Sequence, residues 1–459
     1  MSNQGLNIKE VADLERSLGL DNLLIKEIPI WRIIRFQVRS NLARKVGRPS
    51  NTKKAKLALS MILQNFIDSY KQVRRLKHQQ TEIENIIFAF PRLYKIRDSY
   101  VDKFTDPLIE LSDLKRSYII FQRYHSGQHH EPRFHQDKTI KMDYIELSSL
   151  LCALVTLPLF ALRHWGVLRK FFRALSCIDS TGIKERIVHT LLISSFFIQV
   201  KQYRKIFSLH KTKRVFIVNR AVFFAPSVAI KSLDGEAFEL QHGITMGDTV
   251  LYTGDYRKEI DPDYFLTFGS IWTGPQFGIP EERIRCIGWA YREMLQLNHN
   301  TPVLYKTILV VSRPQITKEI VELSVQWAQW WDHLQFHIRL HPQEELSPQQ
   351  EELLGQYQNI QMSDTKIDSF IALQSYSHVV GDISSVLFEA LSMGKLVGKL
   401  NFGIFASRST PSQYYEDFFI INTPKELLSF AEQKDLNHHS DNFYTDFDTE
   451  YFNHQILNK

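Results

Sequence analysis

The segment GDISSVLFEALSMGK, residues 381–395, places two serines between a short apolar run and an amphipathic segment. Ser384 and Ser385 would cap the helix and present their hydroxyls beside its free backbone N–H groups, where the helix dipole favours an anion. Glu389 lies four residues after Ser385, on the same helical face, at a depth that suits the hydroxyls of a ribose. The segment therefore predicts a nucleotide phosphate site. A plain helix cap, with Glu389 balancing Lys395, would use the same residues.

A histidine and a glycine, His242 and Gly243, end the apolar run AFELQHG at residues 237–243. The unperturbed pKa of histidine lies near neutrality, so His242 is a candidate general base. A glycine beside it lets the backbone approach a substrate closely. A structural histidine that satisfies local backbone groups is the alternative, and the residues alone leave both interpretations open.

Two further polar segments follow apolar runs. SRP brings Ser312 and Arg313 to the end of one run, where the arginine could bind a phosphate through two N–H groups. RLHP ends the next run, and Pro342 stops the strand so that His341 points off the sheet edge. His341 could bind a phosphate oxygen or protonate a leaving group, although an isolated His-Pro pair also occurs as an ordinary turn.

These polar residues share a position at the carboxyl ends of predicted strands, where ligands bind in open α/β sheets. Short β-branched or aromatic runs alternate with helical segments, which predicts parallel sheets with helices on both faces. We therefore expect an α/β fold with two doubly wound, Rossmann-type domains facing a cleft. The predicted strands are residues 85–90, 117–122, 214–219, 237–243, 263–269, 283–289, 308–312, 336–342, 359–363, 378–382, 396–400 and 418–422.

The chain of 459 residues divides into four predicted regions. Residues 1–80 form an extra, basic helical region, residues 81–295 a first Rossmann-like domain with a helical insertion, residues 296–440 a second, and residues 441–459 a tail. The first region holds 16 Lys and Arg against 6 Asp and Glu.

Two interpretations of the basic region remain. Its helices, joined by a loop at residues 47–52, pack on the next domain with their basic faces in water, or residues 30–80 attach to an anionic membrane surface. We expect no nucleic-acid partner, because no nucleic-acid motif accompanies the charge.

The longest apolar run, residues 147–162, is shorter than a membrane-spanning helix needs and contains Pro158. It predicts a buried or interfacial helix. Three cysteines without metal-ligand spacing, and a polar start without an apolar signal core, indicate a cytoplasmic protein, either free or peripheral on the inner face of the membrane. No P-loop, GxGxxG turn, nucleophile elbow or metal-binding carboxylate pair is present, so no metal and no cofactor is expected.

The order HG, then HP, then DxSSVxFEALxxGK resembles bacterial surface-polysaccharide transferases of the GT-B architecture. The families concerned are the CDP-glycerol glycerophosphotransferases and the bacterial sialyl-, polysialyl- and Kdo-type capsule transferases. The resemblance covers roughly residues 214–425, which makes the first Rossmann-like domain the acceptor side and the second the nucleotide-sugar donor domain.

The resemblance implies a role for each matching residue. His341, Pro342, Asp382, Ser384 and Ser385 would belong to the donor site, and Glu389 would contact the ribose. His242 would be the acceptor base. Sialyltransferases use an acidic pair before a glycine as the base, and the nearest match here is the single Asp234 in LDGE. The identity of the base therefore remains open between His242 and Asp234, and His242 is favoured.

The resemblance implies a metal-independent glycosyltransferase of capsule, lipopolysaccharide or other surface-glycan synthesis. Its donor would be a nucleotide-activated sugar, CMP- or CDP-linked rather than UDP-linked, and its acceptor a glycan or a lipid-linked glycan. A UDP-sugar epimerase-like enzyme on the same fold and a catalytically silent scaffold of a glycan-assembly complex are the alternatives.

Overall fold

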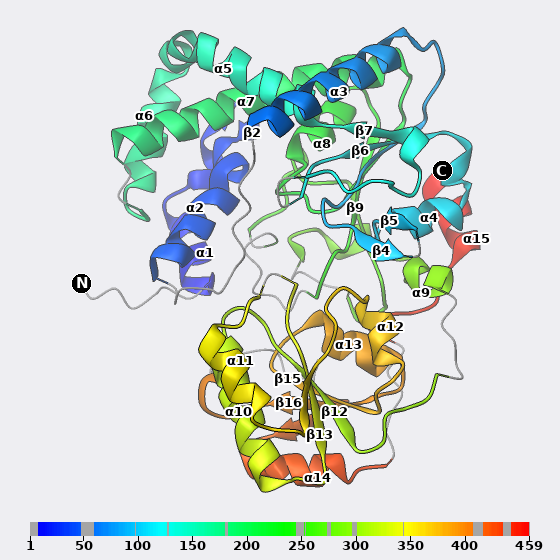
Figure 1. Cartoon of the computed structure of the whole chain (residues 1–459). Helices are drawn as coiled ribbons and strands as arrows, with labels where there is room; N and C mark the ends of the chain where they lie inside the picture. Colours follow the sequence, from blue (N-terminus) through cyan, green and yellow to red (C-terminus); the bar gives the residue numbers. More distant parts are fainter. Residues whose placement is uncertain are drawn as a thin grey trace.

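The computed structural model describes residues 8–46, 59–96, 98–125, 128–179, 182–244, 252, 254–272, 277–295, 301–342, 344–406, 416–434 and 442–458. Within them the chain forms two parallel β-sheets, one above the other in Figure 1, each flanked by helices. The predicted α/β fold with two doubly wound domains is therefore confirmed.

The N-terminal domain is built on a seven-stranded sheet whose strand pairs are all parallel. Its central strands are continuous apolar runs, because both faces of a parallel sheet are covered. The sequence does not predict the edge strand β7, which is only three residues long and polar at both ends. The order across the sheet is β11 (Ile284–Cys286), β10 (Tyr264–Thr267), β9 (Glu236–Leu240), β8 (Arg214–Ile217), β3 (Asn85–Phe88), β6 (Tyr118–Gln122) and β7 (Thr139–Lys141).

The C-terminal domain repeats this plan with six parallel strands. Its strand order is β14 (Ile360–Met362), β13 (Gln335–Arg339), β12 (Thr307–Val311), β15 (His378–Gly381), β16 (Leu396–Leu400) and β17 (Phe419–Ile421). The helices between them are α10 (Thr317–Trp330), α11 (Pro348–Gly355), α12 (Ser369–Leu373), α13 (Ser385–Ser392) and α14 (Leu427–Ala431). The strand order changes direction between β12 and β15, which is where α/β sheets bind ligands.

Long helices cover one face of the N-terminal sheet (Figure 1). They are α3 (Leu59–His78), α5 (Asp143–Arg163), α7 (Ile183–Leu209) and the shorter α8 (Phe224–Lys231). Helix α6 (Trp165–Leu175) follows α5 and packs on the N-terminal segment instead, where Phe171 contacts Trp31. The predicted run 147–162 is the body of α5, and only 17% of its most apolar window is buried. The alternative of a buried helix is therefore wrong, and most of this apolar helix faces outward.

The N-terminal helices α1 (Ile8–Ser17) and α2 (Ile30–Val46) are held by arginines that point inward. Arg35 and Arg39 both donate to Glu15 at 2.6 Å, and Arg32 donates to Asp21 at 3.0 Å. All three arginine side chains are buried, so the expectation that basic side chains lie in water is wrong for these three residues of α2. They are equally unavailable to a membrane surface, and the predicted loop 47–52 lies outside the described residues.

The C-terminal segment returns to the N-terminal domain through α15 (Thr449–Tyr451) and the helical turn Phe452–Leu457. The Phe452 ring lies 6.2 Å from the Phe216 ring of the first sheet, and Asp113 donates its N–H to Asn453 at 2.9 Å. At Gly288, φ is 81°, and an added Cβ would lie 2.0 Å from the carbonyl oxygen of Asp446. This close approach of two backbones explains a glycine at that position.

Candidate functional site

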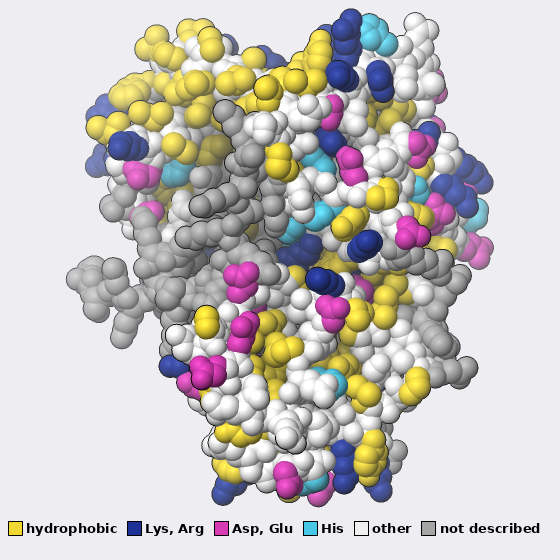
Figure 2. All heavy atoms as spheres, viewed as in Figure 1, with side chains coloured by type: hydrophobic (Ala, Val, Ile, Leu, Met, Phe, Trp, Pro, Cys, Tyr) yellow, Lys and Arg dark blue, Asp and Glu magenta, His cyan; other side chains and the backbone are white. Residues whose placement is uncertain are grey.

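The two sheets turn the carboxyl ends of their strands toward a common junction, which joins the domains through both ionic and apolar contacts. Lys103, in the loop before α4 (Asp106–Glu110), lies 3.6 Å from Glu389 of α13. Trp289 of the first domain packs on Phe370 of the second, at 6.5 Å between ring centroids. Figure 2 shows Lys, Arg and His side chains gathered along this junction.

His242 follows β9 at this junction, half-buried, between two aromatic side chains. The Phe90 ring lies 5.6 Å away, and the Tyr252 hydroxyl lies 3.4 Å from Nδ1. Burial, together with the positive charges of Arg220 and Arg92, lowers the pKa of His242 to about 4. The imidazole is therefore neutral at pH 7, with one nitrogen able to accept a proton.

A buried ionic cluster behind His242 fixes the state of Tyr252. Arg220 donates its backbone N–H to Glu239 at 2.9 Å, its side chain donates to the same carboxylate, and its guanidinium lies 4.9 Å from the Tyr252 ring. Burial, the charge of Glu239 and a hydrogen bond to Glu239 raise the pKa of Tyr252, so its hydroxyl stays protonated. If the tyrosine proton goes to Glu239, the tyrosine oxygen accepts from His242, and on that basis we assign the proton to Nδ1 and the basic lone pair to Nε2.

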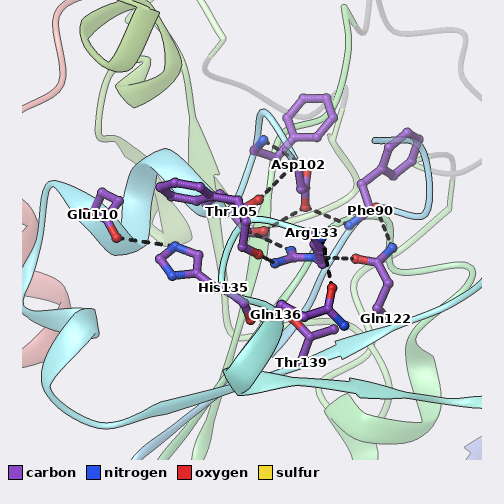
Figure 3. Close-up of polar contacts among 12 residues, drawn as sticks. Phe90, Asp102, Thr105, Glu110, Gln122, Arg133, His135, Gln136 and Thr139 are labelled. Carbon is purple, nitrogen blue, oxygen red and sulfur yellow. Dashed lines mark hydrogen bonds and ion pairs between the residues drawn. The ribbon is translucent and has the colours of Figure 1, made fainter. Parts of the chain in front are cut away.

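A second buried cluster holds the loop that carries Phe90 and Lys103 (Figure 3). The Asp102 carboxylate accepts the N–H of Phe90 at 2.9 Å and of Phe104 at 3.0 Å, and the hydroxyl of Thr105 at 2.7 Å. Burial and the neighbouring Asp106 carboxylate raise the pKa of Asp102 to about 7, although these three donors favour its charged form.

The rest of this cluster ties the loop to the sheet. Asp106 accepts from the Arg133 guanidinium at 2.8 Å, and Gln122 at the end of β6 bridges Arg133 and the Phe90 carbonyl at 3.1 Å each. Phe90 is thereby set against His242 and Lys103 against Glu389.

His341 follows β13 on the opposite side of the junction, half-buried, and the next residue, Pro342, is exposed. Burial and the charge of Arg92 lower the pKa of His341 to about 4. The ring is therefore neutral at pH 7, so it serves as a hydrogen-bond partner rather than as a charged acid.

The buried Glu344 carboxylate fixes the His341 loop. It accepts the backbone N–H of His341 at 2.5 Å, the Ser312 hydroxyl at 2.8 Å and the Thr317 hydroxyl at 2.6 Å. One side chain thus joins the ends of β12 and β13 to the start of α10. Glu344 is not among the residues predicted from the sequence, although a carboxylate three residues after His341 is a recognisable capping signal.

We expect Glu344→Ala to lower the free energy of unfolding by about 2–4 kcal/mol, because three buried donors lose one charged acceptor. We also expect weaker nucleotide binding, because the His341 loop is no longer held. Glu344→Gln is the matched control, since its amide oxygen can still accept the His341 N–H while both hydroxyls accept from its NH2 group. Denaturant unfolding and calorimetric titration measure both effects, and equal losses in the two variants would contradict the positioning role.

Arg313, at the end of β12, is already occupied by a carboxylate. Its Nε donates to Asp382 at 3.0 Å, its Nη2 contacts the same oxygen, and Lys399 lies 3.4 Å from the other oxygen. Ser312 is likewise buried and donates to Glu344. Two predicted donor-site residues, Arg313 and Asp382, therefore bind one another, and a third, Ser312, binds Glu344.

The start of α13 matches the arrangement expected from its sequence. Ser384 caps the helix and accepts the N–H of Val386 at 3.3 Å. Ser385 follows as the first helical residue, half-buried, and its hydroxyl makes no hydrogen bond with the described residues. Glu389 is buried one turn deeper, where Ser369 donates to it at 2.5 Å and Lys103 pairs with it. Within this structure both oxygens of Glu389 therefore have protein partners.

Arg92, in the loop after β3, is a site residue that was not predicted from the sequence. Its positive charge lowers the pKa of both His242 and His341, which places it near both histidines although they belong to different domains. The Arg92 side chain makes no hydrogen bond or ion pair with the described residues. A basic, tyrosine-rich stretch after a buried strand is the signal that was available in the sequence.

The two remaining predicted residues lie at different ends of β9. Gly243 follows His242 at the junction, and no described atom lies within 4 Å of the position that its Cβ would take. Asp234 is exposed on the turn between α8 and β9, at the amino end of β9. The whole length of β9 separates it from His242, so the structure does not bring the two alternative bases together. Among the described residues, no group of three or more His, Cys, Asp or Glu is placed to hold a metal ion.

Solved structures of similar fold include nucleotide-sugar enzymes. UDP-GlcNAc 2-epimerase from Methanocaldococcus jannaschii is 11% identical, covers 82% of this chain and 99% of its own, and has a TM-score of 0.49. S. aureus MnaA, solved with UDP, is 11% identical over 82% of this chain and 95% of its own, with a TM-score of 0.47. The wall teichoic acid polymerase TagF, solved with CDPG, is 12% identical over 84% and 90%, with a TM-score of 0.43.

No family model and no curated protein sequence matches the chain. Structural similarity at this level carries no argument about the reaction. The function must therefore be inferred from the junction itself.

Proposed function

We propose that the chain is a metal-independent glycosyltransferase that moves a sugar from a nucleotide-activated donor to a surface-glycan acceptor. One observation carries the proposal. The positive charge of Arg92, an arginine that forms no ion pair with the described residues, lowers the pKa of two neutral histidines from different domains, His242 and His341. Such a site has a base on one side and groups that bind a phosphate anion on the other.

The donor side would be formed by Arg92, His341 and the start of α13. The guanidinium supplies charge, the imidazole and the Ser385 hydroxyl supply hydrogen bonds, and the helix N-terminus supplies free N–H groups. These groups stabilise the negative charge that grows on the departing phosphate in the transition state. Arg313 is left out of this set, because Asp382 holds it.

The acceptor side would be formed by His242. Its Nε2 removes the proton of the acceptor hydroxyl as that oxygen bonds to the transferred sugar carbon. The bond from this carbon to the phosphate oxygen breaks, and its electron pair leaves with the nucleotide. Glu239 and Tyr252 keep the proton of the resting imidazole on Nδ1 and therefore leave Nε2 free.

The resemblance in sequence favours cytidine over uridine in the donor, and a glycan or lipid-linked glycan as acceptor. The epimerase alternative predicts a different substrate requirement, because an epimerase converts a nucleotide sugar without any acceptor. A silent scaffold would bind without turnover. Incubation with a nucleotide sugar, with and without a glycan acceptor, separates the three by product analysis.

The first test is thermal stabilisation of the full chain by CMP, CDP, UMP, UDP and GDP, each with a chelator present. We expect one nucleotide to raise the melting temperature, because it binds only the folded chain. At a nucleotide concentration of a hundred times Kd, the free energy of unfolding should rise by about 2.7 kcal/mol. The variants Ser385→Ala and His341→Ala should weaken that shift, because both remove a hydrogen bond to the phosphate.

The matched control is Ser392→Ala, which changes a serine at the other end of α13 whose hydroxyl donates to the Glu389 carbonyl. It should leave the nucleotide shift as in the wild type. No stabilisation by any nucleotide would remove the donor site from the junction and favour the scaffold. A shift that appears only when Mg2+ replaces the chelator would contradict metal independence.

A further inference from the structure

An exposed apolar face covers the end of the molecule formed by α5, α6 and the first turns of α7. Val155 is 81% exposed, Leu162 77% and Ile183 78%. Leu159, Trp165 and Ile187 extend the same face. Figure 2 shows hydrophobic side chains gathered over this end, which lies on the side of the first domain away from the second. Exposed patches of this kind mark contact surfaces in soluble proteins.

Helix α5 is long and apolar enough to cross a membrane, but both of its ends are tied to one folded body. It begins directly after β7 of the sheet, and Gln202 of α7 donates to Ser148 and Ser149 at 3.2 Å. It ends against α6, whose Phe171 packs on Trp31 of α2 at 6.4 Å. A helix held at both ends in the same domain cannot span a bilayer. It can lie in the plane of one.

Basic side chains surround this apolar face. Residues 163–188 contain six Lys and Arg against two acidic residues, Asp179 and Glu185. On α6 the two kinds of side chain share one helix, because Leu168, Phe171 and Leu175 are buried while the basic residues point outward. The exposed basic residues of the segment are Arg163, Arg169, Lys170, Arg173, Lys184 and Arg186.

We propose that this face docks on an anionic lipid surface, with α5 and α6 lying in its plane. Apolar side chains with a basic rim and an exposed tryptophan are the composition of helices that bind at the headgroup boundary. A second copy of the chain fits less well, because a two-fold interface would bring the basic rims of the two copies together, and their positive charges would repel each other. Anionic headgroups neutralise the same charges.

This surface is centred outside the region 30–80 expected from the charge of the sequence. Arg32, Arg35 and Arg39 of that region are buried in ion pairs, whereas its second helix, α3, packs beside α5 and borders the apolar face. The proposal does not depend on the proposed function, because lipid binding is measured without nucleotide, sugar or turnover. Failure of one therefore leaves the other standing.

The experiment is co-sedimentation of the full chain with vesicles of phosphatidylcholine alone or of an equimolar mixture with phosphatidylglycerol. We expect binding to the mixed vesicles, weakening as salt is raised, and at least a tenfold loss in Val155→Asp/Leu159→Asp, whose side chains lose their apolar contact with lipid. Lys170→Glu/Arg173→Glu should lose binding to mixed vesicles by a comparable factor, because it reverses two charges.

The control variant is Tyr305→Asp, which makes the same kind of change at a side chain 82% exposed on the second domain. It should bind like the wild type. Circular dichroism of each variant confirms that the helices remain. Wild-type protein that stays in solution with anionic vesicles overturns the proposal. The proposal is also overturned if light scattering shows that the wild type is a dimer and that Val155→Asp/Leu159→Asp is a monomer. A second copy of the chain would then cover this face.

Discussion

Replacement of His242 by alanine should lower kcat by about 100- to 10,000-fold, the range that a positioned general base contributes. The melting temperature should change little by comparison. The ring is half-buried and packs on Phe90, yet its one hydrogen bond to the described residues is the contact of 3.4 Å to Tyr252. A large loss of turnover with a small loss of stability is the signature of a residue that acts on the substrate.

The pH dependence sharpens this prediction. A base works in its unprotonated form, and the pKa of His242 is lowered from 6.5 to about 4. The value of kcat/KM should therefore stay level as the pH falls from 7 to near 5, and drop as it passes about 4. A histidine in water would give a drop near 6.5.

Arg92→Gln should move that drop to higher pH, because one of the two positive charges that lower the pKa of His242 is removed. Folding must be followed at each pH by circular dichroism. Between 4 and 6.5 the unfolded chain binds more protons at His242 and His341 than the folded chain does, so stability also decreases as the pH falls through this range.

Two variants control the experiment. His337→Ala removes a histidine of β13 that contacts Tyr376, away from the junction, and should keep kcat near the wild-type value. Tyr252→Phe should lower kcat less than His242→Ala and leave KM unchanged, because it removes only the hydroxyl that holds the His242 proton on Nδ1 and keeps the imidazole itself. Full turnover in His242→Ala would sink the assignment of the base and return the question to a substrate-assisted or scaffold role.

Most strands could be predicted because parallel strands buried on both faces appear as unbroken apolar runs. NIIF at Asn85–Phe88 and TILVV at Thr307–Val311 are buried at every position. The short edge strand Thr139–Lys141 carries too few apolar residues for that signal. The polar residues that end strands were predictable for the same reason, since a run that stops at His242 or His341 defines its own carboxyl end.

What the sequence could not show is which charges meet. Arg313 and Asp382 lie 69 positions apart, and only the pairing of β12 with β15 brings them together. Lys103 and Glu389 come from different domains. Arg32, Arg35 and Arg39 of α2 follow a helical spacing that fits a water-facing surface, and the positions of Asp21 and Glu15 turn them inward. Such partners follow from tertiary structure rather than from local pattern.

The ion cluster at Asp382 makes the largest prediction about stability. Asp382 is buried between Arg313, whose side chain is 14% exposed, and Lys399, whose side chain is 7% exposed. Asp382→Ala leaves both cations without their carboxylate. Loss of one partner of a buried pair costs about 3–5 kcal/mol, because the remaining charge stays in a poorly solvated site. For a domain of this size the melting temperature should fall by roughly 10 °C.

A second substitution separates this mechanism from simple loss of packing. Asp382→Ala/Lys399→Met should recover part of the lost stability, because it also removes the more deeply buried cation. The control Glu322→Ala breaks an exposed pair with Lys318 in the same domain and should cost only about 0.3–0.5 kcal/mol. If Asp382→Ala unfolds at the same temperature as Glu322→Ala, the carboxylate does not hold these strands together. Asp382 would then be free to contact a donor, as the resemblance implies.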